Sequence, residues 1–202
     1  MKKILFIILM VLPVMAATAQ NTWEVSENEN GKKQNVDSKY LVGAVPVIDG
    51  KVVFETNICA PGLSAGQIYS KLLGYMTAMT KEKNQLEQSR IAIKDSIKHE
   101  ICGSYQEWLV FKSTALVLDR TRMFYNLVAE CKDGSANVKM TRIYYLYDEE
   151  RNPETYKAEE WITDEVGLKK NKDRLSRVSG KFRKKTIDRK DYIFNKIAEL
   201  LK

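Results

Sequence analysis

The sequence predicts an α+β fold, an antiparallel sheet of about five strands with helices packed on one face. Three observations predict it. Apolar and polar side chains alternate with a period of two over most of residues 40–147. A helical spacing interrupts this alternation at 64–81, and a second helical spacing follows a strongly basic stretch near the C-terminus.

Length and composition favour one globular domain. The chain has 202 residues, of which 44% are hydrophobic and 29% are charged, close to the averages of globular proteins. It has a single histidine, His99, and three cysteines, with no close cluster of Cys and His. This argues against the usual structural zinc sites and against common His-dependent chemistry. We therefore expect no metal and no cofactor, and no catalytic residue is assigned.

The N-terminus has the pattern of a cleaved secretory signal. Residues 1–3 are Met-Lys-Lys, residues 4–12 are an unbroken apolar run, and residues 17–19 are Ala-Thr-Ala. We expect residues 1–19 to be a signal peptide cleaved after Ala19, which predicts a periplasmic or secreted protein. The apolar run is too short to span a bilayer, so the mature form should have no transmembrane span. The polar residues 20–38 read as a flexible leader.

The first half of the predicted α+β domain, residues 39–150, contains one strand and one helix. In residues 51–59 the side chains of one face are apolar or β-branched, namely Val52, Phe54, Thr56 and Ile58. An Ala-Pro-Gly break follows. Ser64 and Gln67 then form a capping-box signature, which predicts a helix that reaches about Lys81.

The second half of this domain is a run of strands. The strand-like patterns cover residues 91–101, 107–118, 122–132 and 137–147. A turn is expected at 119–121. Asp133 and Gly134 are a strong hairpin signal, because this pair tolerates the positive φ that tight turns need.

The C-terminal part, residues 151–202, is a basic segment that ends in a helix predicted from Asp188. Residues 169–190 contain eleven Lys or Arg against two Asp, a net charge of +9. Packing alone gives little reason for such density, which fits either a solvated surface that aids solubility or a site for anionic groups. The candidate binding residues are Lys181, Arg183, Lys184, Lys185 and Arg189.

Several of these segments together resemble one known family. They are residues 45–54 (VPVIDGKVVF), 62–64 (GLS) with Ile68 and Tyr69, 132–134 (KDG) and 180–191 (GKFRKKTIDRKD). They look like secreted proteins of Gram-negative bacteria that carry the domain of unknown function 4468. The resemblance covers about residues 45–150, with the basic segment as a companion. It implies a fold similar to that of the TATA-binding protein, and it implies no activity. DNA binding does not follow from a shared fold, because function depends on the site.

Three functions remain open from the sequence. The favoured one is a non-enzymatic exported or envelope-associated binding module, whose basic segment contacts an acidic protein or an anionic envelope surface. We expect no nucleic acid partner, and no oligomeric state is predicted. The second is a small periplasmic hydrolase or lyase that uses Asp95 and His99. The third is an accessory subunit of an envelope complex that docks through the strand around residues 144–147.

The cysteines leave two alternatives. Cys59, Cys102 and Cys131 are odd in number, so an oxidising compartment permits at most one internal disulfide. Three free thiols are the other possibility. Cys102 follows His99 by three residues, which puts the two side chains on opposite faces of a regular strand and disfavours a Cys/His pair.

Overall fold

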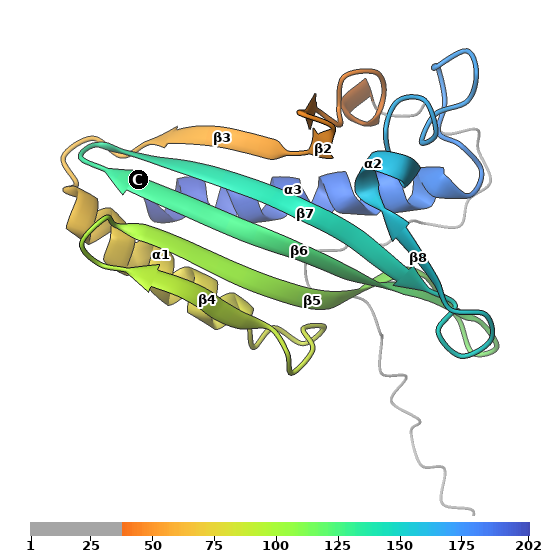
Figure 1. Ribbon diagram of the computed structural model, residues 1–202, viewed down its shortest axis with the longest axis horizontal. Coiled ribbons are helices and arrows are strands. Elements are labelled where there is room, and N and C mark those ends of the chain that lie inside the picture. The colour runs from red at the N-terminus through yellow and green to blue at the C-terminus, as the bar shows by residue number, and fades with distance from the viewer. Residues whose placement is uncertain (1–37) are drawn as a thin grey trace, which may run out of the picture.

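A computed structural model describes residues 38–202 of the chain (Figure 1). The predicted signal peptide and almost all of the predicted leader lie outside the described residues. In chain order the elements are η1 (Ser38–Tyr40), β1 (Val47–Ile48), β2 (Lys51–Val52), β3 (Phe54–Cys59), α1 (Ala65–Met79), β4 (Arg90–Asp95), β5 (Glu100–Ser113), β6 (Leu118–Lys132), β7 (Ser135–Tyr147), β8 (Glu154–Lys157), α2 (Ala158–Trp161) and α3 (Ser179–Leu200).

Within residues 38–202, the main sheet is antiparallel and has six strands. Its order is β3-β7-β6-β5-β4, and β8 also pairs with β7. β3 pairs with residues 135–140 of β7 and β8 with residues 144–147, so these two short strands lie along the same edge of β7. β1 and β2 form a separate small hairpin. The predicted α+β class with an antiparallel sheet is confirmed, with β8 as an additional short strand.

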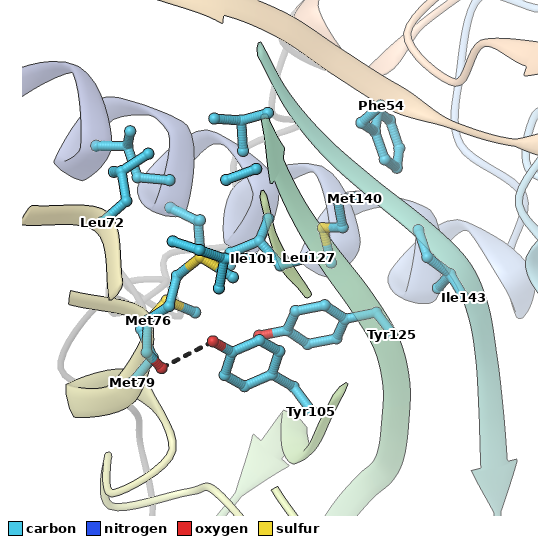
Figure 2. Close-up of a cluster of buried hydrophobic side chains, with 14 of the residues drawn as sticks. Phe54, Leu72, Met76, Met79, Ile101, Tyr105, Tyr125, Leu127, Met140 and Ile143 are labelled. Carbon is cyan, nitrogen blue, oxygen red and sulfur yellow. Dashed lines mark hydrogen bonds between the residues drawn. The ribbon is translucent and has the colours of Figure 1, made fainter. Parts of the chain in front are cut away.

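The two long helices pack on one face of this sheet (Figure 1). Leu72 and Met76 of α1 belong with Leu127 of β6 to the core that Figure 2 shows, and the Tyr105 hydroxyl donates a hydrogen bond to the carbonyl oxygen of Met76 at 2.8 Å. Ile193 of α3 belongs to the same hydrophobic core. Alternate residues of β5, β6 and β7 are buried there, which is the period of two that the sequence shows. The opposite face of the sheet carries no helix among the described residues.

The capping box and the hairpin are confirmed. The backbone N–H of Gln67 donates to the Ser64 hydroxyl, and the backbone N–H of Ser64 donates to the Gln67 side chain, as in a complete capping box. Gly134 has φ +75° in the β6–β7 turn. Its carbonyl oxygen accepts a hydrogen bond from the N–H of Ala60 at 2.8 Å, which holds this turn against the start of α1.

One turn interrupts a predicted strand, and another lies elsewhere than predicted. The pattern at 91–101, interpreted as one strand, is broken by a turn at 96–99, where the Asp95 carboxylate accepts the backbone N–H groups of Ile97 (3.0 Å) and Lys98 (2.9 Å). β5 then continues to Ser113, and the next turn is at 114–117 rather than 119–121. Alternation alone does not reveal these turns, because the apolar period persists on both sides of each.

Helix α3 begins at Ser179 rather than at Asp188. Lys and Arg are good helix formers, so the basic stretch continues the helix toward its N-terminus. Phe182 and Ile187 lie in the same core as the sheet residues. The basic segment is thus packed against the α+β domain. No helix among residues 38–202 is both long and apolar enough to cross a membrane.

Candidate binding surfaces

Arg183 lies inside the molecule. Its side chain has no exposed surface, and its guanidinium donates to the carbonyl oxygens of Tyr40 (2.7 Å), Leu41 (2.5 Å) and Ile162 (2.7 Å). An ion pair of 2.7 Å to Asp164 completes the set. Arg183 therefore ties α3 to the N-terminal turn and to the segment after α2, and it is not presented to a partner.

Arg189 is also buried and ion-paired. Its Nε lies 2.8 Å from Glu107 of β5, and Nη2 lies 2.6 Å from Glu82 after α1. Burial by itself would lower the pKa of Arg189, but the nearby Glu107, Tyr125 and Glu82 together outweigh burial and hold the pKa well above its ordinary value. Arg189 is thus a permanent charge that joins α3 to the sheet.

The remaining three candidate residues differ in environment. Lys181 points to the sheet, where its Nζ lies 2.7 Å from Asp119 and 3.0 Å from the Tyr147 hydroxyl. Lys184 and Lys185 are half-buried on the side of α3, with the Lys184 Nζ 5.7 Å from the centre of the Tyr40 ring. The structure therefore does not gather the five predicted residues on one surface.

Among the eleven Lys and Arg of residues 169–190, the exposed ones lie in the loop before α3. We call residues 169–177 the basic loop; its exposed cations are Lys169, Lys170, Lys172, Arg174 and Arg177. The loop is closed by the backbone hydrogen bonds from Lys169 N–H to the Arg174 carbonyl (2.8 Å) and from Lys172 N–H to the Lys169 carbonyl (2.7 Å). With five cations and one acid, Asp173, its net charge is +4. The cations of residues 169–190 thus divide into exposed ones in the basic loop and buried or half-buried ones on α3.

A groove of about 550 Å³ opens between the β5–β6 turn and the β7–β8 loop. Its walls are residues 116–120, residues 146–151 and Trp108. The Arg120 guanidinium stacks on the Trp108 ring, 3.8 Å from its centre. Arg122, on the uncovered face of the sheet beside the groove, makes an ion pair of 2.7 Å with Glu149. This end of the sheet therefore combines apolar, aromatic and arginine side chains.

Asp95 and His99 are both used by the β4–β5 turn. The Asp95 carboxylate holds the backbone of that turn, whereas the His99 ring packs edge-on against Tyr69 of α1, with centroids 5.9 Å apart. His99 has φ +56°, so it also makes the left-handed bend of the turn. The groove lined by Trp108 lies at the other end of β5.

Two further predicted features are placed by the structure. Cys59, Cys102 and Cys131 are free thiols, exposed, half-buried and buried respectively. Residues 144–147 pair with β6 on one side and with β8 on the other. Docking through this strand would therefore use side chains on its uncovered face, such as Tyr144, and not backbone pairing.

Comparison with known proteins identifies the family. The model of the domain of unknown function (DUF4468) with TBP-like fold matches residues 54–146. A solved DUF4468 family protein from Bacteroides ovatus is 43% identical, with 84% of this chain and 96% of that chain covered and a TM-score of 0.77. A TBP-like protein from Parabacteroides distasonis is 18% identical, with 78% and 96% covered and a TM-score of 0.60, and it supports the fold alone. No curated protein is significantly similar to the chain. With a solved relative at this identity over nearly its whole length, the chain belongs to the DUF4468 family, which has a TBP-like fold and no known function.

Proposed function

We propose that this protein is a non-enzymatic, exported binding module of the bacterial envelope, and that its basic loop contacts an acidic protein or an anionic envelope surface. The signal pattern of residues 1–19 supports export. The observation that carries the binding proposal is the exposure of all five cations of the basic loop on a closed turn.

The loop is suited to long-range attraction. Lys172 and Arg174 have exposed ion pairs of 3.5 Å with Glu165 and Asp173, and pairs of this kind contribute little in water. A cation near an anionic surface contributes about 1 kcal/mol. Several cations of one loop acting together therefore give useful affinity at low salt.

Helix α3 fits this role less well. The side chains of Arg183 and Arg189 make internal ion pairs, so replacing either would destabilise the fold and would not report on binding alone. A test of the basic segment must therefore change the loop and leave these arginines in place.

The test uses the mature chain, which begins at residue 20. It measures how strongly this chain binds vesicles that contain anionic phosphatidylglycerol, over a range of salt concentrations. Binding should be appreciable at low salt, fall steeply as salt rises, and be several-fold weaker in the variant K169Q/K170Q/K172Q. The matched control, K94Q/K98Q/K132Q, removes the same charge from exposed positions on β4, the β4–β5 turn and the end of β6. An equal loss of vesicle binding in both variants would mean that binding depends only on the net charge of the protein, and it would contradict a binding site in the basic loop.

Export has its own measurement. Intact mass and N-terminal sequencing of the protein from a bacterial periplasm should give a mature chain that begins at Gln20. An unprocessed chain held in the inner membrane would contradict the proposed location.

A further inference from the structure

The turn between β5 and β6 presents an unusual apolar tip. Leu116 is 96% exposed, Val117 is 47% exposed and Leu118 is 51% exposed. Single exposed leucines are ordinary, but three consecutive large apolar residues at the end of a hairpin form a contiguous patch. We call residues 114–118 the apolar tip. In the part of the chain that the structure describes, its three large apolar side chains are exposed.

The polar groups at the two sides of the tip are paired with each other. The N–H of Thr114 donates to the Val117 carbonyl at 2.8 Å, and the N–H of Val117 donates to the Thr114 hydroxyl at 3.1 Å. Backbone groups that enter an apolar medium without partners are costly. The turn therefore satisfies part of its backbone hydrogen bonding internally, which lowers the cost of moving it into an apolar medium.

Behind the tip stand side chains typical of a water–lipid boundary. Lys112 is exposed, and Trp108 lines the groove with Arg120 stacked on its ring. Indole rings and long cationic side chains favour such boundaries, because each has an apolar body and a polar end.

The acidic residues near the tip are partly neutralised. Asp119 is paired with Lys181, and Glu149 is paired with Arg122. The acidic groove residues Asp148 and Glu150 oppose an anionic surface, and Arg151 beside them offsets one of these charges.

The apolar tip and the basic loop lie at the same end of the molecule. Asp119 follows the tip directly and binds Lys181 in the first turn of α3, and the basic loop ends two residues before that helix begins. Figure 1 shows the start of α3, the β5–β6 turn and the β7–β8 loop at one end of the long axis. An apolar prong and a set of exposed cations thus share one end of the fold.

We propose that the apolar tip inserts Leu116 and its neighbours into a lipid bilayer whose anionic head groups the basic loop contacts. This inference rests on the proposed function and names its partner as lipid. Charge complementarity supports it. The size of the patch supports it too. Each partner in a stable protein interface contributes roughly 20 to 30 residues, far more than the three side chains of the tip. A small apolar insertion combined with cations instead suits peripheral membrane binding.

The experiment compares Leu116→Ser with Ile97→Ser in vesicle flotation at low salt. Ile97 is 90% exposed and lies in the β4–β5 turn, at the other end of the 14-residue strand β5, so it is a matched apolar control. Leu116→Ser should weaken partitioning about tenfold, and Ile97→Ser should leave it unchanged.

Insertion itself is read with lipids brominated along their acyl chains. The fluorescence of the variant Leu116→Trp should be quenched by these lipids more strongly than that of Ile97→Trp. Both variants retain the same native tryptophans, so the difference in quenching reports on the introduced tryptophan alone. Both variants are also applied to immobilised polyglutamate, which offers anionic groups without lipid, and there they should bind equally.

The outcomes separate the two proposals. Wild-type binding to vesicles with no effect of Leu116→Ser and no extra quenching overturns insertion and leaves the basic loop as the binding element. Binding to polyglutamate without binding to vesicles also overturns it, and assigns an acidic protein as partner. Absence of salt-dependent binding to either overturns both the insertion and the proposed function.

Discussion

Arg142 occupies a strained position in the middle of β7. Phe124 of β6 pairs with Tyr144 and Asn126 pairs with Thr141, so β7 has one more residue than β6 between these pairs. This bulge gives Arg142 a φ of +53°, which is uncommon for a side chain other than glycine, and leaves it exposed. Such a conformation costs about 1 kcal/mol or more.

The first prediction follows from this strain. Arg142→Gly should raise the free energy of unfolding by about 0.5 to 1 kcal/mol, since relief of the left-handed strain exceeds the entropy that glycine adds to the unfolded chain. Thr141→Gly, at the preceding residue with negative φ, should lower it by about 1 kcal/mol. Urea unfolding of both variants measures the difference, and a loss of stability in Arg142→Gly would contradict the strain.

The three thiols should differ in reactivity. Burial raises the pKa of Cys131 to about 11, so near pH 8 its thiol stays protonated in the folded protein. Cys59 is exposed. Iodoacetamide at pH 8 should therefore alkylate Cys59 at least tenfold faster than Cys131, as followed by peptide mass mapping. In urea the two rates should converge, and equal rates in the folded protein would contradict the burial.

At the scale of elements, α3 is held to the sheet by charge as well as by apolar packing. Arg189 and Glu107 are 0% and 1% exposed, and each neutralises the other. Breaking one half of such a pair leaves a buried charge without a partner, whereas replacing both halves often costs little.

The corresponding prediction is a double-mutant cycle. Arg189→Met should lower the free energy of unfolding by about 3 to 5 kcal/mol, and Arg189→Met combined with Glu107→Gln should recover part of the loss. Lys196→Met, at an exposed pair on the same helix, should change it by less than about 0.5 kcal/mol. Additive losses in the double variant would mean that the pair is not coupled.

The β6–β7 hairpin gives a second prediction at this scale. Gly134 has φ +75°, and its N–H donates to the carbonyl oxygen of Leu63 at 2.9 Å. The same residue therefore makes the turn and holds it to the loop that leads into α1. Gly134→Val should destabilise the fold by roughly 1 kcal/mol or more, because a β-branched residue is strained there. An unchanged urea midpoint would show that the turn has another conformation in solution.

At the scale of the whole molecule, the core is rich in tyrosine. Burial raises the pKa of Tyr105, Tyr125 and Tyr145 above the ordinary value of 10.0. In the unfolded chain these phenols lose their protons near pH 10, but in the folded protein they retain them. Their contribution to stability is therefore complete below pH 10 and is lost as the pH rises above it.

This predicts unfolding in alkali. Above pH 10 the free energy of unfolding should fall by about 1.4 kcal/mol per pH unit for each buried tyrosine. Urea midpoints measured from pH 8 to pH 11 give the slope, and Tyr145→Phe should make that slope shallower. A stability that does not change over this range would contradict the burial of the phenols.

Local rules were enough for much of this fold. The alternation in β6 and β7, the Ser64 capping box and the Gly134 turn each depend on residues close together in the sequence. The alternation does not predict the turn at 96–99, because Asp95 and His99 fall on the same face as the isoleucines of a regular strand. The strand ends through the hydrogen bond of the Asp95 carboxylate and the positive φ of His99.

The sequence by itself determined the fold class, the family resemblance and the location of the positive charge in one segment. Only the tertiary structure decided which of those charges face outward. Arg189 meets Glu107 82 positions away, and Arg183 meets carbonyl groups more than 140 positions away at Tyr40 and Leu41. The same packing left residues 169–177 and the apolar tip exposed. A charge pattern records how many cations a segment has, but its burial depends on distant partners that the pattern does not contain.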